Sequence, residues 1–339
     1  MVDGVERVSG APLGEFEIIA RYFAPLASDP AALGLLDDAA VLSVPEGQEL
    51  VATCDTIIEG VHFLAGDPAQ SIGHKALAVN LSDLAAKGAK PHAYLLALAL
   101  REPPSPAWLE GFSEGLRAVQ EQAGIDLVGG DTSATPGPLT ISITALGLVP
   151  QGEAVLRRGA VAGDRLYVSG TIGDAVLGLR LSREPRLASA WGLSAAERDL
   201  LIERYRRPEA RGPLALPLRH YAHAAIDVSD GLVGDAGKLC KASGVSARIE
   251  ATRLPLSSPA AKAVARRPAL LAELLTGGDD YEIVAAIAEA NARGYATEAK
   301  EHQVSVTAIG AVVPGDGEVR VLDEEGSALE LGRVGFAHF

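Results

Sequence analysis

The sequence predicts an α+β protein of the α/β-sandwich type with two domains, residues 1–150 and 151–339. Segments with the alternating pattern of strands and segments with the spacing of helices follow one another in both halves of the chain. The length of 339 residues exceeds what one hydrophobic core usually organises, and no repeat of 20–50 residues indicates a solenoid. Two mixed domains therefore explain the pattern best.

The first half alternates between helix-like and strand-like segments. Residues 15–27 carry apolar side chains at helical spacing, namely Phe16, Ile19, Ala20 and Phe23. Residues 39–57 predict two short strands around a Pro-Glu-Gly turn, and residues 71–91 predict a helix that ends at Gly88. The elements expected next are a strand at 93–100, a helix at 106–124, and strands at 125–130 and 141–150.

The second half opens with GDRLYVSGTIGDAVLGL, residues 163–179, whose pattern predicts a strand, a glycine turn and a helix. The same order recurs at 224–244, where a strand enters at Ala224 and a helix follows Asp230. Later strands are expected at 281–288 and 304–313. The Ala- and Arg-rich stretch 181–223 allows no assignment.

Composition excludes several classes of protein. The net charge of −14 argues against a general nucleic-acid binder, because no sustained Lys/Arg patch offsets it. The longest clean apolar run, AYLLALAL at 93–100, is far too short to span a bilayer, and the acidic N-terminus lacks the apolar core of a signal peptide. Cys54 and Cys240 have neither disulfide-framework nor metal-site spacing, so reduced core thiols and a cytoplasmic location are expected.

Short carboxylates interrupt several apolar runs. In AAIDVSDGL, residues 224–232, Asp227 and Asp230 stand among apolar and small residues, where an unpaired carboxylate is costly. Comparable positions, most of them next to Gly, Ser or Thr, are held by Asp37, Asp38, Asp55, Asp83 and Asp131. Each alone could be a helix N-cap or a turn aspartate. Together they favour a cluster of Mg²⁺ ligands that shares substrate phosphates.

Two local patterns support a phosphate-binding site. Asn80, Asp83 and Lys87 share one face of their predicted helix. In GGDTS, backbone N–H groups before Asp131 can lie against a nucleotide phosphate. The chain has no P-loop motif and no protein-kinase glycine loop with its partner motifs, and the glycines of 170–178 are better explained as a strand-to-helix turn.

The order of motifs resembles one family. Eight motifs follow one another along the chain: EFEIIARYF, DDAAVL, CDTIIEGVHF, KALAVNLSDLAAKGAKP, VGGDTS, GDRLYVSGTIGD, AAIDVSDGL and GGDDYE. This set is similar to the thiamine-monophosphate kinases of the aminoimidazole-ribonucleotide-synthetase-like superfamily. The resemblance runs from about residue 14 to the C-terminus and is weakest in 181–223 and 285–330. It implies a PurM-like two-domain fold and a homodimer whose N-terminal sheets form a barrel.

The resemblance also implies an activity and a set of site residues. ATP would donate its γ-phosphate in line to the phosphate of thiamine monophosphate, with several Mg²⁺ ions as cofactors. The acceptor is already ionised, so neither a covalent nucleophile nor a general base is assigned. By motif position, the residues implied to bind metal are Asp38, Thr53, Cys54 (through its backbone carbonyl), Asp55, Asp83, Asp131, Asp227 and Asp230. Those implied to contact ATP are Gly130, Asp131, Arg157 and Ser229, and those implied to contact the thiamine substrate are His62, Asp279 and Phe336.

Two positions depart from the family pattern. Leu36 replaces the glycine of the usual Gly-Asp-Asp motif, and Asp279 replaces the glutamate of the usual Gly-Gly-Glu-Asp-Tyr motif. Simpler explanations exist for single residues: a core histidine bonded to a backbone carbonyl for His62, a surface pair for Arg157 and Arg158, and an anchor of the tail for Phe336.

Three other functions fit parts of the pattern. A selenophosphate synthetase-like enzyme uses a reactive Cys or selenocysteine in an N-terminal glycine-rich loop, whereas the first cysteine here is Cys54. An aminoimidazole-ribonucleotide-synthetase-like ligase is disfavoured by the VHF and NLSDLAAKGA motifs. A non-catalytic module would bind ATP and Mg²⁺ without turnover, and an assay of ADP release separates it from a kinase.

Overall fold

The computed structural model describes residues 13–332 and residue 335. By its internal contacts the chain divides into two compact units. The first unit is Met1–Ser43, Asp55–Ala76 and Ala93–Thr144, and the second is Val44–Cys54, Leu77–His92 and Ala145–Phe339. The domain division predicted at residue 150 stays a prediction.

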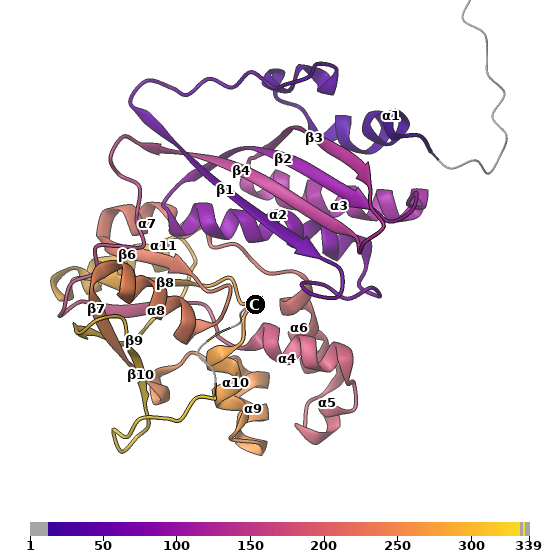
Figure 1. Cartoon of the computed structure of the whole chain (residues 1–339). Coiled ribbons are helices and arrows are strands. Elements are labelled where there is room, and N and C mark those ends of the chain that lie inside the picture. The colour runs from indigo at the N-terminus through magenta and orange to yellow at the C-terminus, as the bar shows by residue number, and fades with distance from the viewer. Residues whose placement is uncertain (1–12, 333–334, 336–339) are drawn as a thin grey trace, which may run out of the picture. The chain divides into compact units, whose positions relative to one another are not determined.

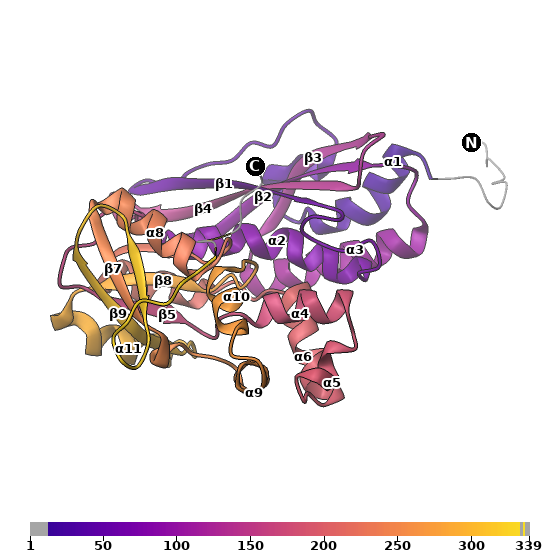
Figure 2. The same cartoon turned by 60° about the horizontal axis from the view of Figure 1, so that its bottom comes forward.

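One sheet has four strands in the order β1-β4-β2-β3 (Figure 1). Its strands are β1 (Gln48–Ile58), β2 (Lys90–Leu100), β3 (Asp126–Ala134) and β4 (Thr140–Pro150). β2 and β3 run parallel, and their register places Ala97 beside Asp131. Figures 1 and 2 show α2 (Ala69–Ala86) and α3 (Pro106–Ala123) along one face of this sheet. Burial accordingly alternates along β4, as expected for a sheet covered on one face.

Glycines let α2 and α3 approach closely within the first unit. A Cβ at Gly73 would lie 2.1 Å from the carbonyl oxygen of Phe112. A Cβ at Gly115 would lie 2.0 Å from the carbonyl oxygen of Gln70. Any side chain at either position would push the two helices apart, so the helix pair depends on these glycines.

The other sheet has six strands in the order β10-β7-β9-β5-β8-β6. Its strands are β5 (Arg165–Ser169), β6 (Ala222–Asp227), β7 (Val245–Glu250), β8 (Ile283–Ile287), β9 (Val306–Pro314) and β10 (Val319–Leu322). Only the β10–β7 pair is parallel, and the four other neighbouring pairs in the described sheet are antiparallel.

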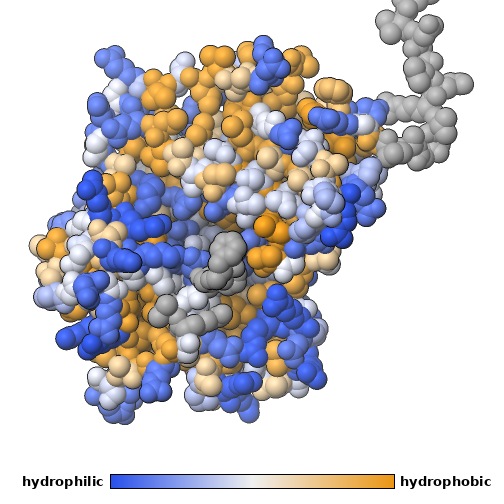
Figure 3. Space-filling view, viewed as in Figure 1, coloured by the Kyte–Doolittle hydropathy of each residue, from blue (hydrophilic) through white to orange (hydrophobic). Residues whose placement is uncertain are grey.

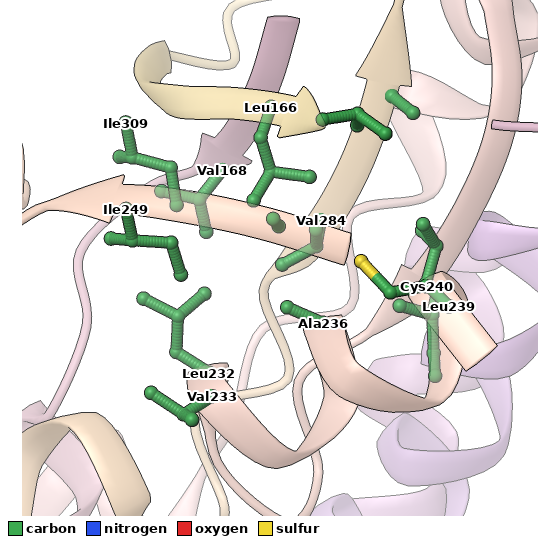
Figure 4. Close-up of a cluster of buried hydrophobic side chains, with 14 of the residues drawn as sticks. Leu166, Val168, Leu232, Val233, Ala236, Leu239, Cys240, Ile249, Val284 and Ile309 are labelled. Carbon is green, nitrogen blue, oxygen red and sulfur yellow. The ribbon is translucent and has the colours of Figure 1, made fainter. Parts of the chain in front are cut away.

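Both faces of the six-stranded sheet are covered. Leu166 and Val168 of β5 point toward α8 (Leu232–Ser243), and Figure 4 shows them with side chains of β7, β8 and β9 in one buried cluster. Tyr167, between them in sequence, packs on the opposite face with α7 (Ala215–Tyr221) and α11 (Ala292–Glu301). Strands with alternate side chains buried on both faces explain the long apolar runs of the second half.

A helical cluster completes the second unit. Its helices are α4 (Asp174–Arg183), α5 (Leu187–Ala190), α6 (Ala195–Arg206), α9 (Ser258–Arg266) and α10 (Leu270–Thr276). Trp191 is buried in their shared core, and the Arg180 guanidinium lies 5.4 Å from the centre of its ring. The stretch 181–223, which allowed no assignment, thus contains α5, α6 and α7 between the end of α4 and the start of β6.

The predicted α+β class is confirmed, as are most predicted elements, but the first half required three corrections. Residues 39–47 form no strand, so only β1 flanks the Pro-Glu-Gly turn. Residues 15–26 are helical as α1 (Glu15–Ile18), a π-helix (Ile19–Phe23) and a 3₁₀ turn (Ala24–Leu26). Phe23 is buried as predicted, together with Ile18 and Tyr22, but Phe16 is 83% exposed and Ala20 is exposed. The wider π turn departs from the 3.6-residue period on which the predicted face relied. Cys54 is exposed, whereas Cys240 is buried as expected.

Two strands of the second half, β7 and β10, were not predicted. Within residues 13–332, no helix has the length and apolar content needed to cross a membrane.

Candidate active site

Asp227 stands at the end of β6, where the strand meets the loop that leads to α8. Its side chain is buried, and its Oδ2 accepts a hydrogen bond from the Ser82 hydroxyl at 2.9 Å. Ser82 belongs to the C-terminal half of α2 and is itself fully buried. The carboxylate is therefore fixed by a helix that is 145 residues distant in sequence.

Asp230 lies three residues further along the same loop and has different partners. Asp235, in the first turn of α8, accepts the backbone N–H groups of Asp230 at 2.8 Å and of Gly231 at 3.1 Å. Lys238 forms ion pairs with both Asp230 and Asp235. Burial raises the pKa of Asp235, and the Lys238 ammonium acts in the opposite direction. The loop is thus held at its start by Ser82 and at its end by a cap from α8.

Asp83 lies on α2 next to Ser82, and its Oδ2 accepts a hydrogen bond from the Thr53 hydroxyl on β1. One turn later, Lys87 donates a hydrogen bond to the carbonyl oxygen of Ala225 on β6 at 2.9 Å. These contacts all lie in the second unit. They place the predicted ligands Thr53, Asp83 and Asp227 on three adjoining elements.

The electrostatics around Lys87 identify its neighbours. Burial lowers the pKa of Lys87 to about 8, and the Arg157 guanidinium contributes in the same direction. The carboxylates of Asp227 and Asp83 partly oppose this shift. Arg157, which was predicted to contact ATP, therefore lies within electrostatic reach of the Lys87 ammonium.

A turn of unusual conformation lies against the Asp227–Asp230 loop. Asp279 and Tyr281 have φ angles of 75° and 51°, in the left-handed region that residues other than glycine rarely adopt. The Asp279 N–H donates to the Ser229 carbonyl at 2.9 Å, and the Tyr281 N–H donates to the Val228 carbonyl at 2.8 Å. The predicted substrate residue Asp279 and the predicted ATP residue Ser229 are therefore backbone partners.

The remaining described candidates lie mainly in the first unit. Gly130 on β3 needs to be glycine, because a Cβ there would lie 1.9 Å from the Leu96 carbonyl oxygen. His62 is half-buried, and its Nδ1 accepts the Ile58 N–H at 3.0 Å. This bond to a backbone amide is a structural contact of the histidine ring, and the predicted contact with thiamine stays a prediction. The other candidates in this unit are Asp38, Asp55 and Asp131, and Phe336 lies outside the described residues.

The donor chemistry of the candidates suits Mg²⁺. The predicted ligands offer carboxylate, hydroxyl and backbone carbonyl oxygens, which are the donors that this hard cation prefers. Among the residues that the structure describes, no three His, Cys, Asp or Glu side chains are grouped closely enough to hold an ion. The predicted set is shared between the two units, so its roles stay predictions.

Sequence reasoning missed the polar residues that hold the candidates in place. They are Ser82, Asp235, Lys238, Asp280 and Glu282. Ser82, Asp280 and Glu282 stand within the quoted motifs, and Asp235 and Lys238 follow AAIDVSDGL in sequence, but no local periodicity indicates their distant partners.

Comparison with known proteins places the chain in a family. Models of AIR synthase related proteins match residues 36–149 with their N-terminal domain and residues 161–323 with their C-terminal domain. A thiamine-monophosphate kinase of Caulobacter vibrioides is 43% identical over 99% of this chain and 94% of its own length. That of Escherichia coli K12 is 41% identical over 96% of this chain and 98% of its own length.

Solved structures point to the same family as the sequence relatives. Thiamine-monophosphate kinase from Stenotrophomonas maltophilia is 41% identical, with a TM-score of 0.81 over 94% of this chain and 99% of that one. The chain belongs to the thiamine-monophosphate kinase family. A structure of AaThiL complexed with AMPPCP and TMP is 31% identical, with a TM-score of 0.74 over 99% of this chain and all of that one. The Escherichia coli hydrogenase maturation protein HypE, at 22% identity and a TM-score of 0.77, shares the fold alone.

Membership of the thiamine-monophosphate kinase family confirms the PurM-like two-domain fold. The structure also gives a physical account of one departure from the family motif. Asp279 has a φ of 75°, and aspartate is among the residues that tolerate this conformation best after glycine. Leu36, the other departure, is 92% exposed, so its side chain is accommodated without a clash in the chain.

Proposed function

We propose that this protein is a thiamine-monophosphate kinase, which converts ATP and thiamine phosphate into ADP and thiamine diphosphate. The observation that carries the proposal is the backbone pairing of the Asp279–Tyr281 turn with Val228 and Ser229. It joins the residues proposed for the acceptor to those proposed for the nucleotide. The similarity over the full chain to thiamine-monophosphate kinases supports the same activity.

The metal ligands of this enzyme are proposed to be the eight residues at the family positions. They are Asp38, Thr53, Cys54 through its carbonyl, Asp55, Asp83, Asp131, Asp227 and Asp230. Bound Mg²⁺ would neutralise the phosphates of donor and acceptor and hold them in line. Thr53 and Ser82 orient two of the ligands, Asp83 and Asp227, through the hydrogen bonds described above.

The organic parts of the two substrates are assigned to different residues. Gly130, Asp131, Arg157 and Ser229 are proposed to contact ATP. His62, Asp279 and Phe336 are proposed to contact the thiamine end. Because the attacking phosphate is already ionised, the reaction needs positioning and charge neutralisation rather than a general base. A homodimer in the cytoplasm completes the proposal.

The proposal is tested by measuring ADP release with thiamine phosphate, with free thiamine and with neither. The kinase is expected to release ADP and form thiamine diphosphate only with thiamine phosphate, because free thiamine has no phosphate to hold in line. ADP release that does not depend on the acceptor, or binding of ATP without turnover, would exclude this function.

Asp83→Asn is the variant that tests the metal role. An amide is a poor Mg²⁺ ligand, so kcat is expected to fall more than tenfold, a loss of over about 1.4 kcal/mol. Asp199→Asn is the matched control, because Asp199 pairs with Arg198 on the exposed surface. Retention of most of the wild-type kcat in Asp83→Asn at saturating Mg²⁺ would show that Asp83 binds no essential metal.

A further inference from the structure

We propose that Glu282, with Arg204 and Arg211, is a positioning residue that fixes the 279–281 turn against the Val228–Ser229 backbone. The inference rests on the proposed function, because it assigns these three residues a part in aligning the acceptor with the nucleotide. None of the three belongs to the predicted set of ligand-contacting residues.

Glu282 is fully buried, yet it is charged and completely paired. Arg211 contacts both carboxylate oxygens, with Nε 2.6 Å from Oε2 and Nη2 2.5 Å from Oε1. Arg204 Nη2 lies 2.8 Å from Oε1, and the Ser169 hydroxyl donates to Oε2 at 2.6 Å. A bidentate arginine fixes the plane of a carboxylate as well as its position. Each carboxylate oxygen thus already accepts two hydrogen bonds from protein groups in a fully buried position, which favours a positioning role over contact with a substrate.

Tyr281, the residue next to Glu282, has a backbone conformation that its surroundings must enforce. Tyr281 is buried and has a φ of 51°. Left-handed backbone at residues other than glycine persists only where the surroundings enforce it. Asp280, on the other side of Tyr281, provides a second anchor, because its carboxylate accepts the N–H groups of Gly173 at 2.7 Å and Ala175 at 3.3 Å. Two buried acids thus hold the turn from both sides.

Backbone hydrogen bonds connect residues 280–282 directly to the candidate site. The Glu282 carbonyl accepts the Val228 N–H at 2.7 Å, and the Val228 carbonyl accepts the Tyr281 N–H at 2.8 Å. Val228 follows Asp227 directly and precedes Ser229, whose carbonyl binds the Asp279 N–H. A Cβ at Gly278 would lie 2.1 Å from the Ser229 carbonyl oxygen, so the two backbones are in close contact. A shift of Glu282 would therefore move the Asp227–Asp230 loop and Asp279 together.

A purely stabilising role explains this arrangement less well. Buried ion pairs contribute little stability compared with apolar side chains of similar size, because both charges lose their hydration. The guanidinium groups of Arg204 and Arg211 instead fix the position of the Glu282 carboxylate. That position lies one residue from the left-handed turn and three residues from Asp279.

The test compares Arg211→Lys with Arg180→Lys as the matched control. Both replace an arginine of a partly buried ion pair in the second unit, but Arg180 pairs with Glu273 and does not contact the turn. Arg211→Lys keeps the charge and loses the bidentate contact. Because Asp279 and the loop that carries Ser229 would move together, we expect Arg211→Lys to raise the KM values for thiamine phosphate and for ATP at least fivefold, whereas Arg180→Lys changes neither. An unchanged KM for thiamine phosphate in folded Arg211→Lys, or an equal rise in Arg180→Lys, would overturn the proposal.

Hydrogen exchange of the substrate-free protein tests the same idea without any activity. The amides of Val228, Asp279 and Tyr281 are expected to exchange at least tenfold faster in Arg211→Lys, while β5 amides keep their wild-type rates. Equal protection of these three amides in both proteins would refute the positioning role even if the enzyme is a kinase. A wild-type protein without kinase activity would instead refute the proposed function alone. If Arg211→Lys does not fold, Arg204→Lys, which loses a single contact to Glu282, is subject to the same criteria.

Discussion

At the scale of single residues, Lys87 shows how burial changes the chemistry of a side chain. Its ammonium lies among Asp83, Asp227 and Arg157, and burial is the largest cause of its lowered pKa. The folded-state pKa of about 8 is well below the ordinary lysine pKa of 10.5. Between these values the unfolded chain binds more protons than the folded protein, so stability rises with pH across this window.

We expect the free energy of unfolding to gain about 2 kcal/mol from Lys87 between pH 8 and pH 9.5. Lys87→Met, which cannot be charged, should lack this gain. The measurement is urea unfolding of both proteins at the two pH values, in EDTA so that no cation alters the charge balance. The same pH dependence in wild type and Lys87→Met would show that Lys87 has an ordinary pKa.

The two cysteines are expected to differ in reactivity. Burial raises the pKa of the Cys240 thiol to about 11, whereas Cys54 is exposed. Because the thiolate is the reactive form, an aromatic disulfide reagent at pH 8 should titrate one thiol in the native protein and a second only in denaturant. Cys54→Ser should abolish the native reaction. Rapid titration of a thiol in native Cys54→Ser would contradict the burial of Cys240.

At the scale of elements, glycine determines how closely helices pack. Gly178 on α4 faces α6, and a Cβ there would lie 2.0 Å from the Leu201 carbonyl oxygen. Gly237 on α8 is also helical, but its nearest neighbours would lie 3.8 Å from a Cβ. A Gly→Ala substitution is therefore expected to change the stability of the protein in opposite directions at the two positions.

Gly178→Ala is expected to destabilise the protein by about 1–3 kcal/mol, because the added methyl forces α4 and α6 apart. Gly237→Ala is expected to stabilise it by about 0.5–1 kcal/mol, because alanine loses less backbone entropy in a helix. Urea unfolding of both variants beside the wild type measures the two changes. Destabilisation of equal size in both would mean that α4 and α6 are not in close contact.

At the scale of the whole molecule, apolar side chains remain exposed on the four-stranded sheet and its N-terminal segment. Figure 3 shows hydrophobic residues gathered over the strands β1–β4. The large apolar side chains exposed in this part of the described chain include Phe16, Leu36, Val41, Val44, Leu50, Val61 and Leu95. Exposed apolar patches of this kind commonly bind another protein surface, which agrees with the proposed homodimer.

We therefore expect a mass in solution of about twice the 35.0 kDa of one chain, measured by light scattering after size exclusion. Leu50→Glu on β1 should shift the protein toward the monomer, because a charge in an apolar interface is costly. Leu200→Glu on α6 is the control, since Leu200 is 49% exposed and Leu50 is 45% exposed. A wild-type monomer, or dissociation by Leu200→Glu as readily as by Leu50→Glu, would exclude a dimer through this sheet.

The sequence by itself determined the kinds of elements and the identity of the candidate residues. Strand and helix periodicities are local, so the order of elements from β2 to α4 could be read from neighbouring residues. The aspartates at strand ends and the glycines beside them were visible for the same reason, and the order of motifs indicated the family. Where local geometry departs from the 3.6-residue period, as in the π turn at 19–23, the predicted buried face was right at Phe23 but wrong at Phe16 and Ala20.

Only the tertiary structure decided which residues hold the site together. The bond from Ser82 to Asp227 spans 145 residues, and that from Arg211 to Glu282 spans 71. The parallel pairing of β10 with β7 likewise joins two short strands that the pattern did not reveal. Such contacts depend on how distant segments pack, and no local periodicity records that packing. The buried charge of Glu282 therefore became interpretable only once its two arginines were placed beside it.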